Sequence, residues 1–512
     1  MKCLALACTL TALAVTLCAA PPNVVIILAD DMGWGDPHCY QAESKIPTPQ
    51  LDRLAAHGMR FTDAHTPSSV CTPTRYTLLT GRYCWRTRLE SGVLDGFSPP
   101  LIENDRPTLA TLLGSAGYQT ACIGKWHLGM QWTRRDGSPE TADRDDRFRS
   151  GETIDFSQPL TAGPLTNGFQ SYFGISASLD MPPYCWIEND RCTPAPDTTV
   201  ETAQDTIFLN QTGGAAHSAF HLDAVLPTLK QRAIRWITEA ARSDRPFFLY
   251  LPLNSPHLPV APSAAFRGQS GLGDYADFVM ETDDCVGGVL DALEAAGVEE
   301  NTLVLFTSDN GGLWHAWEPQ EIDDQRHYKP TPRGQYNLEH GHRSNAHLRG
   351  TKADIWEGGH RVPFLVQWPA RVQGGSVSTA LIELTDVMAT LADATGIPLP
   401  QGAAEDSFSF LPALEQRTDL PPTQRPFAIH HSLRGLFSLR QADWKYVEER
   451  GSGGFSTPRS LNPSEGQPQG QLYHLSVDPQ ETQNLWAEAP DRVQAMQHLL
   501  DRARRTGLTK TP

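Results

Sequence analysis

The sequence predicts an α/β fold in which helices sandwich a mostly parallel central sheet, followed by a small C-terminal α+β domain. Two apolar runs that end in acidic residues, NVVIILADD (23–31) and TLVLFTSDN (302–310), are typical of strands buried on both faces of a parallel sheet. Further apolar runs alternate with helical stretches, which also favours a parallel sheet. After about residue 420 the pattern changes to short segments typical of antiparallel strands. The 512 residues suffice for one large unit and a smaller one.

The other strands of the sheet are predicted from three more apolar runs: YQTACIG (118–124), RPFFLYLPL (245–253) and RVPFLVQWP (361–369). Helices are predicted between the strands, at residues 106–116, 221–242, 274–296 and 383–395. The polar segments 130–165 and 313–350 are rich in Pro, Gly, Arg or His, and we expect them to be loops over a site.

Another helix is predicted at 72–81, with Thr72 as N-cap, Pro73 at the first helical position and Gly81 as the stop. Cys71 then precedes the helix, and Arg75 falls in its first turn. A cation there opposes the helix dipole at a cost of about 0.3–1 kcal/mol, so an anionic partner is expected nearby.

The C-terminal domain is predicted from two segments, IHHSLRGLFSLRQADWKYVEE (429–449) and QLYHLS (471–476), which have the pattern of short strands. A Gly/Ser/Pro-rich loop at 451–470 separates them, and a helix is predicted at 490–505. The predicted domains are therefore an α/β domain at 21–420 and a smaller domain at 421–512, preceded by the segment 1–20.

The first 20 residues have the features of a secretory signal peptide: Lys2, an apolar run, and small residues that suit cleavage after Ala20. Cys18 is compatible with a lipoprotein site, but Val15-Thr16-Leu17 before it lacks the usual small residues. We predict export to a periplasmic, extracellular or lysosome-like compartment, with no membrane span in the mature chain. The net charge of −17 argues against a nucleic-acid partner.

Export makes the cysteine count informative. Ten cysteines are present, and seven remain after the signal peptide is removed, which is an odd number. If Cys71 has another role, six are left: Cys39, Cys84, Cys122, Cys185, Cys192 and Cys285. Cys185 and Cys192 flank a short polar loop and are predicted to form a disulfide.

Four oxygen ligands are expected to meet at the carboxyl edge of the sheet. Asp30 and Asp31 follow one predicted strand, while Asp309 and Asn310 follow another. Such a set suits calcium or magnesium and does not suit zinc. Either pair alone is also explained as turn or cap residues, but the two together favour a metal.

Several segments of the sequence resemble those of a known family. SVCTPTRYTLLTG (69–81) resembles the signature of the type I, formylglycine-dependent sulfatases of the alkaline-phosphatase superfamily, and GYQTACIGKWHLG (117–129) resembles their second signature. The resemblance continues through SPH (255–257) and SDNGG (308–312) to RGTKADIWEGGHRVP (349–363). It covers most of residues 22–370 and implies an alkaline-phosphatase-like fold.

The resemblance implies a role for each matched residue. A maturation enzyme would oxidise Cys71 to Cα-formylglycine, whose hydrated aldehyde is the nucleophile and a ligand of one ion, calcium rather than magnesium. Arg75 would orient this diol, and Lys125 and Lys352 would contact the sulfate. His257 would protonate the leaving oxygen together with Lys352. His127 would deprotonate the second hydroxyl to expel sulfate.

The substrate is expected to be a sulfated carbohydrate, because the chain looks most like arylsulfatases and the sulfatases of glycosaminoglycans and polysaccharides. Within these, the resemblance favours 6-O-sulfated galactose or N-acetylgalactosamine. The loop SLDMPPYCWIEND (178–190) offers Asp180, Tyr184 and Glu188 as sugar ligands. His340, His342 and His347 are expected to be a lid over the pocket rather than a zinc site, with His342 near the substrate.

Two alternatives stay open at this stage. One is a phosphoester or phosphonate monoester hydrolase of the same superfamily, although the set Lys125, His127 and Lys352 favours sulfate. The other is a sulfated-glycan-binding protein without activity, if Cys71 is left unconverted. No oligomeric state is predicted.

Overall fold

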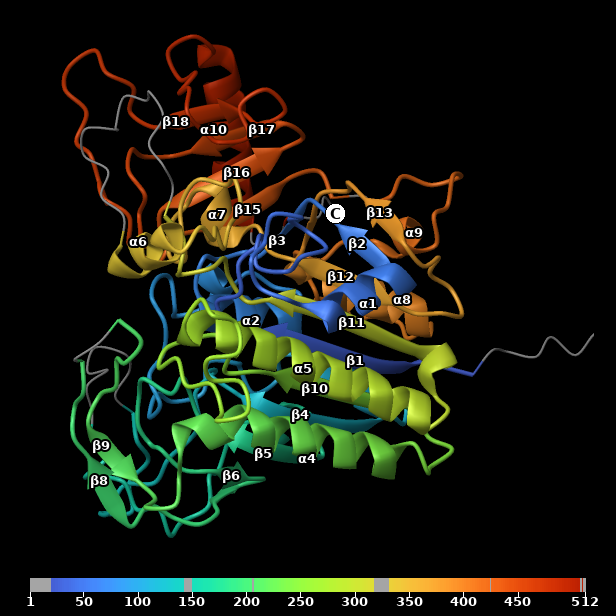
Figure 1. Cartoon of the computed structure of the whole chain (residues 1–512). Helices are drawn as coiled ribbons and strands as arrows, with labels where there is room; N and C mark the ends of the chain where they lie inside the picture. Colours follow the sequence, from blue (N-terminus) through green and yellow to red (C-terminus); the bar gives the residue numbers. More distant parts are fainter. Residues whose placement is uncertain are drawn as a thin grey trace, which may run out of the picture.

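The computed structural model describes residues 20–141, 150–204, 207–316, 331–423, 425–506 and 509. The predicted signal peptide, apart from Ala20, lies outside these residues. The predicted fold class is confirmed: a large, mostly parallel sheet lies between helices, and a smaller antiparallel sheet follows near the C-terminus (Figure 1). In the part of the chain that is described, no helix combines the length and apolarity of a membrane span.

The large sheet has ten strands in the order β13-β2-β12-β11-β1-β10-β4-β5-β6-β7. Its centre is a block of parallel strands: β11 (Thr302–Ser308), β1 (Asn23–Ala29), β10 (Phe247–Pro252), β4 (Gln119–Lys125) and β5 (Ser171–Ile175). The outer strands are β12 (Phe364–Gln367), β2 (Met59–Phe61), β13 (Ser376–Ser378), β6 (Ile187–Glu188) and β7 (Arg191–Cys192). All five strands predicted for this sheet are present.

Strand β1 explains why the central strands are apolar throughout. Val24 and Ile26 pack into the core on one face of the sheet, and Val25 and Ile27 pack into the core on the other. Helices α1 (Pro49–His57), α4 (Val225–Ala240) and α5 (Asp274–Ala295) contribute to the second core, and α4 and α5 lie side by side over that face (Figure 1). Helices α2 (Cys71–Thr80), α3 (Leu109–Ser115) and α8 (Val387–Thr395) contribute to the first.

The C-terminal sheet is antiparallel, as predicted. Its strands are β15 (Ala428–His431), β16 (Phe437–Gln441), β17 (Trp444–Val447) and β18 (Gln471–His474). Helix α10 (Pro490–Thr506) packs on it through Val493, Met496 and Leu500, which recur at helical spacing. Tyr83 of the large domain belongs to the same core, so the two units share buried apolar surface. The domain boundary at residue 420 stays a prediction.

The described chain also has shorter strands and α-helices: β3 (Ala64–His65), β8 (Thr198–Val200), β9 (Gly214–Ala216), β14 (Ile382–Glu383), α6 (Pro332–Glu339), α7 (Glu357–His360) and α9 (Leu411–Leu414). Helix α6 corrects one prediction, because it lies within the expected loop 313–350. The Thr331 hydroxyl accepts a hydrogen bond from Gly334 N, and Pro332 occupies the first turn, so this helix has a regular start.

Two local predictions also differ from the structure. Helix α2 begins at Cys71 with Val70 as its N-cap, and the hydroxyl of Thr72 accepts instead from Leu94 N, 3.3 Å away. Gly81 does end the helix, in the left-handed conformation. Cys185 and Cys192 are neighbours, with sulfur atoms 3.4 Å apart, but both are free thiols in this structure.

Candidate active site

The carboxyl ends of four parallel strands bring chemically active side chains to one edge of the sheet. Asp30 and Asp31 follow β1, Lys125 ends β4, and Asp309 follows β11. His257 comes a few residues after β10. All five are buried, and the most accessible, His257, is 7% exposed. This is the position at which parallel α/β sheets bind ligands.

The acidic residues form one hydrogen-bonded group around unpartnered oxygens. Asp31 N donates to Asp309 Oδ1 (3.3 Å), and Asn310 Nδ2 donates to Asp31 Oδ1 (2.8 Å). Asp30 Oδ1, Asp31 Oδ2 and Asn310 Oδ1 are buried and have no hydrogen-bond partner among the described residues. Buried oxygens without donors are costly, and oxygen is the ligand that calcium and magnesium prefer. The donor set therefore fits a hard divalent cation.

Cys71 and Arg75 bring helix α2 against this group. Ligand atoms of Cys71, Asp30 and Asp309 lie within 4.8 Å of one another. The Arg75 guanidinium donates twice to Asp309 Oδ2 (2.7 and 3.0 Å) and lies 3.6 Å from Asp30 Oδ2. These carboxylates are the anionic partners that the position of Arg75 predicted. Burial raises the pKa of Cys71 to about 11, which disfavours a thiolate nucleophile at neutral pH.

Two lysines complete the charge pattern. Lys125 Nζ lies 2.5 Å from Asp30 Oδ2, and Lys352 Nζ lies 2.6 Å from Asp31 Oδ1. Although burial opposes it, Lys125 above all holds the pKa of Asp30 well below its usual value. Burial alone would lower the pKa of Lys352, but the anionic groups around it, Asp31 first, together raise it. Both lysines are therefore cations beside Cys71.

The two histidines are held by backbone carbonyls that define their tautomers. His127 Nε2 donates to Leu94 O (2.9 Å), which leaves Nδ1 as a buried acceptor without a described partner. His257 Nδ1 donates to Leu258 O (2.5 Å), and its Nε2 lies 3.8 Å from Asp31 Oδ2. Burial lowers the pKa of both imidazoles. Sequence reasoning missed these two carbonyls, because a main-chain acceptor leaves no signature in the sequence.

Three of the nine non-glycine residues with positive φ in the described chain lie in or beside this group. Asp31 (φ 70°), His127 (φ 56°) and Ala353 (φ 77°), next to Lys352, have left-handed backbones although none is glycine. Each such residue costs about 1–3 kcal/mol and persists where the surroundings enforce it.

Comparison with known proteins decides the family. The family model described as "Sulfatase" matches residues 22–397. The chain belongs to the sulfatase family. It is 31% identical to an N-acetylgalactosamine-6-O-sulfatase of Bacteroides thetaiotaomicron, over 94% of this chain and 92% of the relative. It is 34% identical to human arylsulfatase A, over 96% and 89% of the two chains. As a sulfatase, the protein is a sulfuric ester hydrolase.

Solved structures agree with the fold. One from work on glycosaminoglycan metabolism by Bacteroides thetaiotaomicron matches with a TM-score of 0.77 and 29% identity, over 95% of this chain and all of the other. A sulfatase from Pseudoalteromonas sp. matches with a TM-score of 0.68 over 96% of this chain and 92% of the other, and at 23% identity this likeness concerns the fold alone.

The predicted sugar ligands of this sulfatase are not all brought to the catalytic group. Glu188 pairs with Arg232 of α4 (3.0 Å), on the face of the sheet that α4 and α5 cover. The Tyr184 hydroxyl donates to Thr212 O (2.6 Å), and His342 is buried with Nε2 bound to Asp36 Oδ1 (2.8 Å). These three side chains are engaged within the protein. Asp180 differs, because its Oδ1 has no described partner.

A second group of possible metal ligands in the sulfatase is better explained by packing. Ring nitrogens of His65, His360 and His430 lie within 4.8 Å of one another. However, the rings of His360 and His430 stack, with centroids 3.9 Å apart and planes 11° apart. A metal bound to imidazole lies near the ring plane, along the nitrogen lone pair, and two stacked parallel planes share no such point. His340 and His347 likewise contact aromatic rings, of Tyr336 and Trp34.

Proposed function

We propose that this sulfatase is exported and hydrolyses sulfate monoesters on carbohydrates, with 6-O-sulfated galactose or N-acetylgalactosamine as the expected unit. The observation that carries the proposal is the convergence of Cys71, two lysines and His257 on the group of unpartnered oxygens, with His127 two residues after Lys125. The names of the bacterial and human relatives support a sulfate ester as substrate, and the bacterial one supports the sugar.

The nucleophile in this proposal is a hydrated Cα-formylglycine made from Cys71 by a maturation enzyme. Its precursor is a buried, protonated thiol, which is a poor nucleophile itself. Asp30, Asp31, residue 71, Asp309 and Asn310 would hold calcium. When bound, this ion would polarise a sulfate oxygen and lower the pKa of a diol hydroxyl.

Side chains of the protein would bind the sulfate, protonate the leaving oxygen and release the sulfate. Lys125 and Lys352 are buried cations that would neutralise the sulfate oxygens, and Arg75 would position residue 71. Lys352 and His257 lie at opposite oxygens of Asp31, where Lys352 would donate a proton or hydrogen bond to the leaving oxygen. His257 would do the same from Nε2 in its doubly protonated form, because Nδ1 donates to Leu258 O. The free Nδ1 of His127 would accept the proton of the second hydroxyl, which releases sulfate.

The test is co-expression with a formylglycine-generating enzyme, followed by mass spectrometry of the tryptic peptide that contains residue 71. We expect an aldehyde at this position in the active protein. Cys71→Ala should abolish sulfate ester hydrolysis while the melting temperature stays within a few degrees. Full activity in Cys71→Ala, or in protein whose residue 71 is an unmodified thiol, would contradict the proposal.

The alternatives have separate outcomes in the same experiment. Phosphate or phosphonate monoesters assayed beside sulfate monoesters should be hydrolysed more slowly. A preference for phosphate would favour the phosphoester hydrolase. Binding of sulfated glycans without turnover, in protein that carries the aldehyde, would favour the binding protein.

A further inference from the structure

Helix α6 packs on the segment that follows two of the proposed metal ligands. This segment runs from Asp309 and Asn310 to His315, whose carbonyl oxygen would lie 2.3 Å from a Cβ atom built on Gly334 of α6. In Figure 1, α6 lies at the side of the large sheet where the central parallel strands end. The first turn of α6, which contains Arg333, therefore packs on the chain just after the carboxyl end of β11.

Arg333 also contacts a segment that pairs with the chain after His257. Its Nε donates to Ile207 O (2.8 Å), and the next carbonyl, of Phe208, accepts from Val260 N (2.9 Å), three residues beyond His257. Arg333 is thus on the side of the catalytic group at which His257 would meet the leaving oxygen. The sugar of a substrate has to extend from that oxygen.

The charge of Arg333 is not paired with a carboxylate. The side chain is half-buried and makes no ion pair with a described residue, and its guanidinium makes one hydrogen bond, from Nε. Burial lowers the pKa of Arg333, and Asp31 opposes this shift, so the field of that carboxylate reaches the guanidinium. The two terminal nitrogens can donate side by side to an anion.

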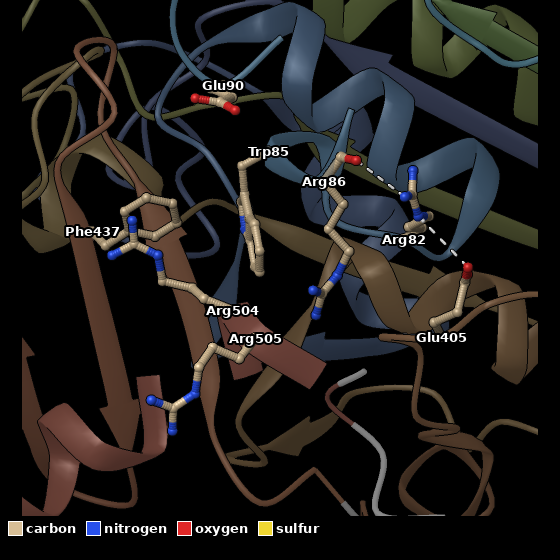
Figure 2. Close-up of a pocket in the computed structure, with 8 residues that line it drawn as sticks. All are labelled: Arg82, Trp85, Arg86, Glu90, Glu405, Phe437, Arg504 and Arg505. Carbon is tan, nitrogen blue, oxygen red and sulfur yellow. Dashed lines mark hydrogen bonds and ion pairs between the residues drawn. The ribbon is translucent and has the colours of Figure 1, made fainter. Parts of the chain in front are cut away.

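Two half-buried arginines elsewhere in the protein show how such a charge is balanced. Arg82 and Arg86 line the pocket drawn in Figure 2. Arg82 contacts Glu103 (3.0 Å) and Glu405 (3.6 Å), and Arg86 makes two hydrogen bonds to Asp406 (2.8 and 2.9 Å). Removing a cation from water without such a partner is costly, and a bound anion offsets this cost. Arg333 therefore has the surroundings of an arginine that binds an anionic ligand.

We propose that Arg333 binds a second anionic group of the substrate, a carboxylate or a further sulfate on the sugar that leaves. This inference rests on the function proposed above, because it takes a sugar sulfate as the substrate. The scissile sulfate would be held by Lys125 and Lys352, whereas Arg333 lies on the side of the leaving sugar. The enzyme would then select acidic sulfated glycans over neutral ones that carry the same ester.

The kinetic test uses two substrates that differ by one charge. One is a disaccharide of N-acetylgalactosamine 6-sulfate and glucuronate, and the other is the same disaccharide with the carboxylate reduced to an alcohol. The wild type should prefer the acidic form by about tenfold in kcat/KM, as a contact worth one decade of affinity does. Arg333→Gln should lose this preference. N-acetylgalactosamine 4,6-disulfate, compared with the 6-sulfate, tests a further sulfate as the anion in the same way.

Arg245→Gln is the matched control. Arg245 is exposed at the amino end of β10, donates to Gly117 O (2.8 Å) and Tyr118 O (3.2 Å), and makes no ion pair with a described residue. This variant removes the same charge at the opposite edge of the sheet and should keep the wild-type preference. If Arg333→Gln slowed the acidic and neutral forms by the same factor, Arg333 would only hold the segment beside His257, and the inference would be overturned. A wild type that preferred neither second anion would also overturn it.

A binding test separates this inference from the proposed function. In isothermal titration, the inactive Cys71→Ala protein with calcium should bind the acidic disaccharide more tightly than the reduced one, and adding Arg333→Gln should remove the difference. If the difference were found but the active enzyme hydrolysed neither disaccharide, the anion site would stand and the proposed substrate would be wrong. If the difference survived Arg333→Gln, the anion would bind elsewhere and the inference would fail.

Discussion

His257→Gln should impair hydrolysis of sugar sulfates far more than hydrolysis of activated aryl sulfates. The alkoxide of a sugar is a strong base and needs a proton as it leaves, whereas a nitrophenolate leaves without much help. Glutamine retains a donor but cannot transfer a proton. The comparison of the two substrates therefore isolates proton donation from the binding of the sulfate.

The structure sets the size of the effect. General acid catalysis contributes about 10²- to 10⁴-fold. His257 Nε2 lies 3.8 Å from Asp31 Oδ2, while Lys352 Nζ lies 2.6 Å from Asp31 Oδ1, so two donors flank the same carboxylate. Because Lys352 remains in the variant, we expect the lower end of this range, about 10²-fold in kcat/KM on a sugar sulfate. The loss on the aryl sulfate should stay below about tenfold.

The assay measures kcat/KM for both substrates with the wild-type enzyme, His257→Gln and His340→Gln. His340 is an exposed histidine on Tyr336 and serves as the control, which should behave as the wild type. The melting temperature of each variant shows whether the fold is intact. If His257→Gln slowed both substrates by the same factor, the reasoning would fail, and His257 would be a residue that binds sulfate.

Three other predictions concern the ion, the second histidine and stability. Chelation of divalent cations should remove most activity, and calcium should restore it. The activity of Asp309→Asn should not respond to calcium. Full activity of the wild type at verified zero metal content would contradict the metal site. His127→Ala should give one turnover and then accumulate sulfated enzyme, seen by mass spectrometry, because Nδ1 no longer accepts the proton; steady turnover without that adduct would refute its role. Burial raises the pKa of Asp283 to about 7, from 3.8, so the native state binds the extra proton and the free energy of unfolding should fall as pH rises through this interval. Asp283→Asn should flatten this part of the pH profile of the melting temperature, and an unchanged profile would show that Asp283 is ionised throughout.

The parts of the fold that sequence predicted are those with an uninterrupted pattern. Strands such as β1 and β11 are buried on both faces, so the residues in their middle form an unbroken apolar run. Strand β5 (SYFGI) was missed because its apolar run is short and contains a glycine. Helix α6 was missed because its Pro and Gly content resembles a loop, although Thr331-Pro332 is a helix-start signal.

The candidate site also has parts that could be predicted from the sequence and parts that could not. Motif residues such as Cys71 and Lys125 could be predicted because their spacing matches a family signature. The contacts that the expected sugar ligands make within the protein could not, because each depends on a distant part of the chain. His342 meets Asp36 across 306 positions, and Glu188 meets Arg232 of a helix that sequence predicted without predicting its neighbours. The type of a polar residue in a loop indicates which bonds it can form, but the tertiary fold decides which residue it meets.

The charges of the catalytic group affect metal binding, substrate binding and the stability of the fold. Three buried carboxylates, of Asp30, Asp31 and Asp309, are balanced by Arg75, Lys125 and Lys352, and each has at least one paired oxygen. The formal charges of the group thus cancel, so we expect the chain to fold without a divalent ion. A neutral group would attract a sulfate ester only weakly. A dication, when bound, would give the group a net positive charge, which would favour the anionic ester and the negative charge that develops on its leaving oxygen. Chelation should therefore remove activity and lower the melting temperature only by the binding energy of the ion, while the far-ultraviolet circular dichroism of the folded chain persists. If chelation unfolded the protein, the three cationic side chains would not be enough to compensate the carboxylates. The ion would then be required for folding as well as for catalysis.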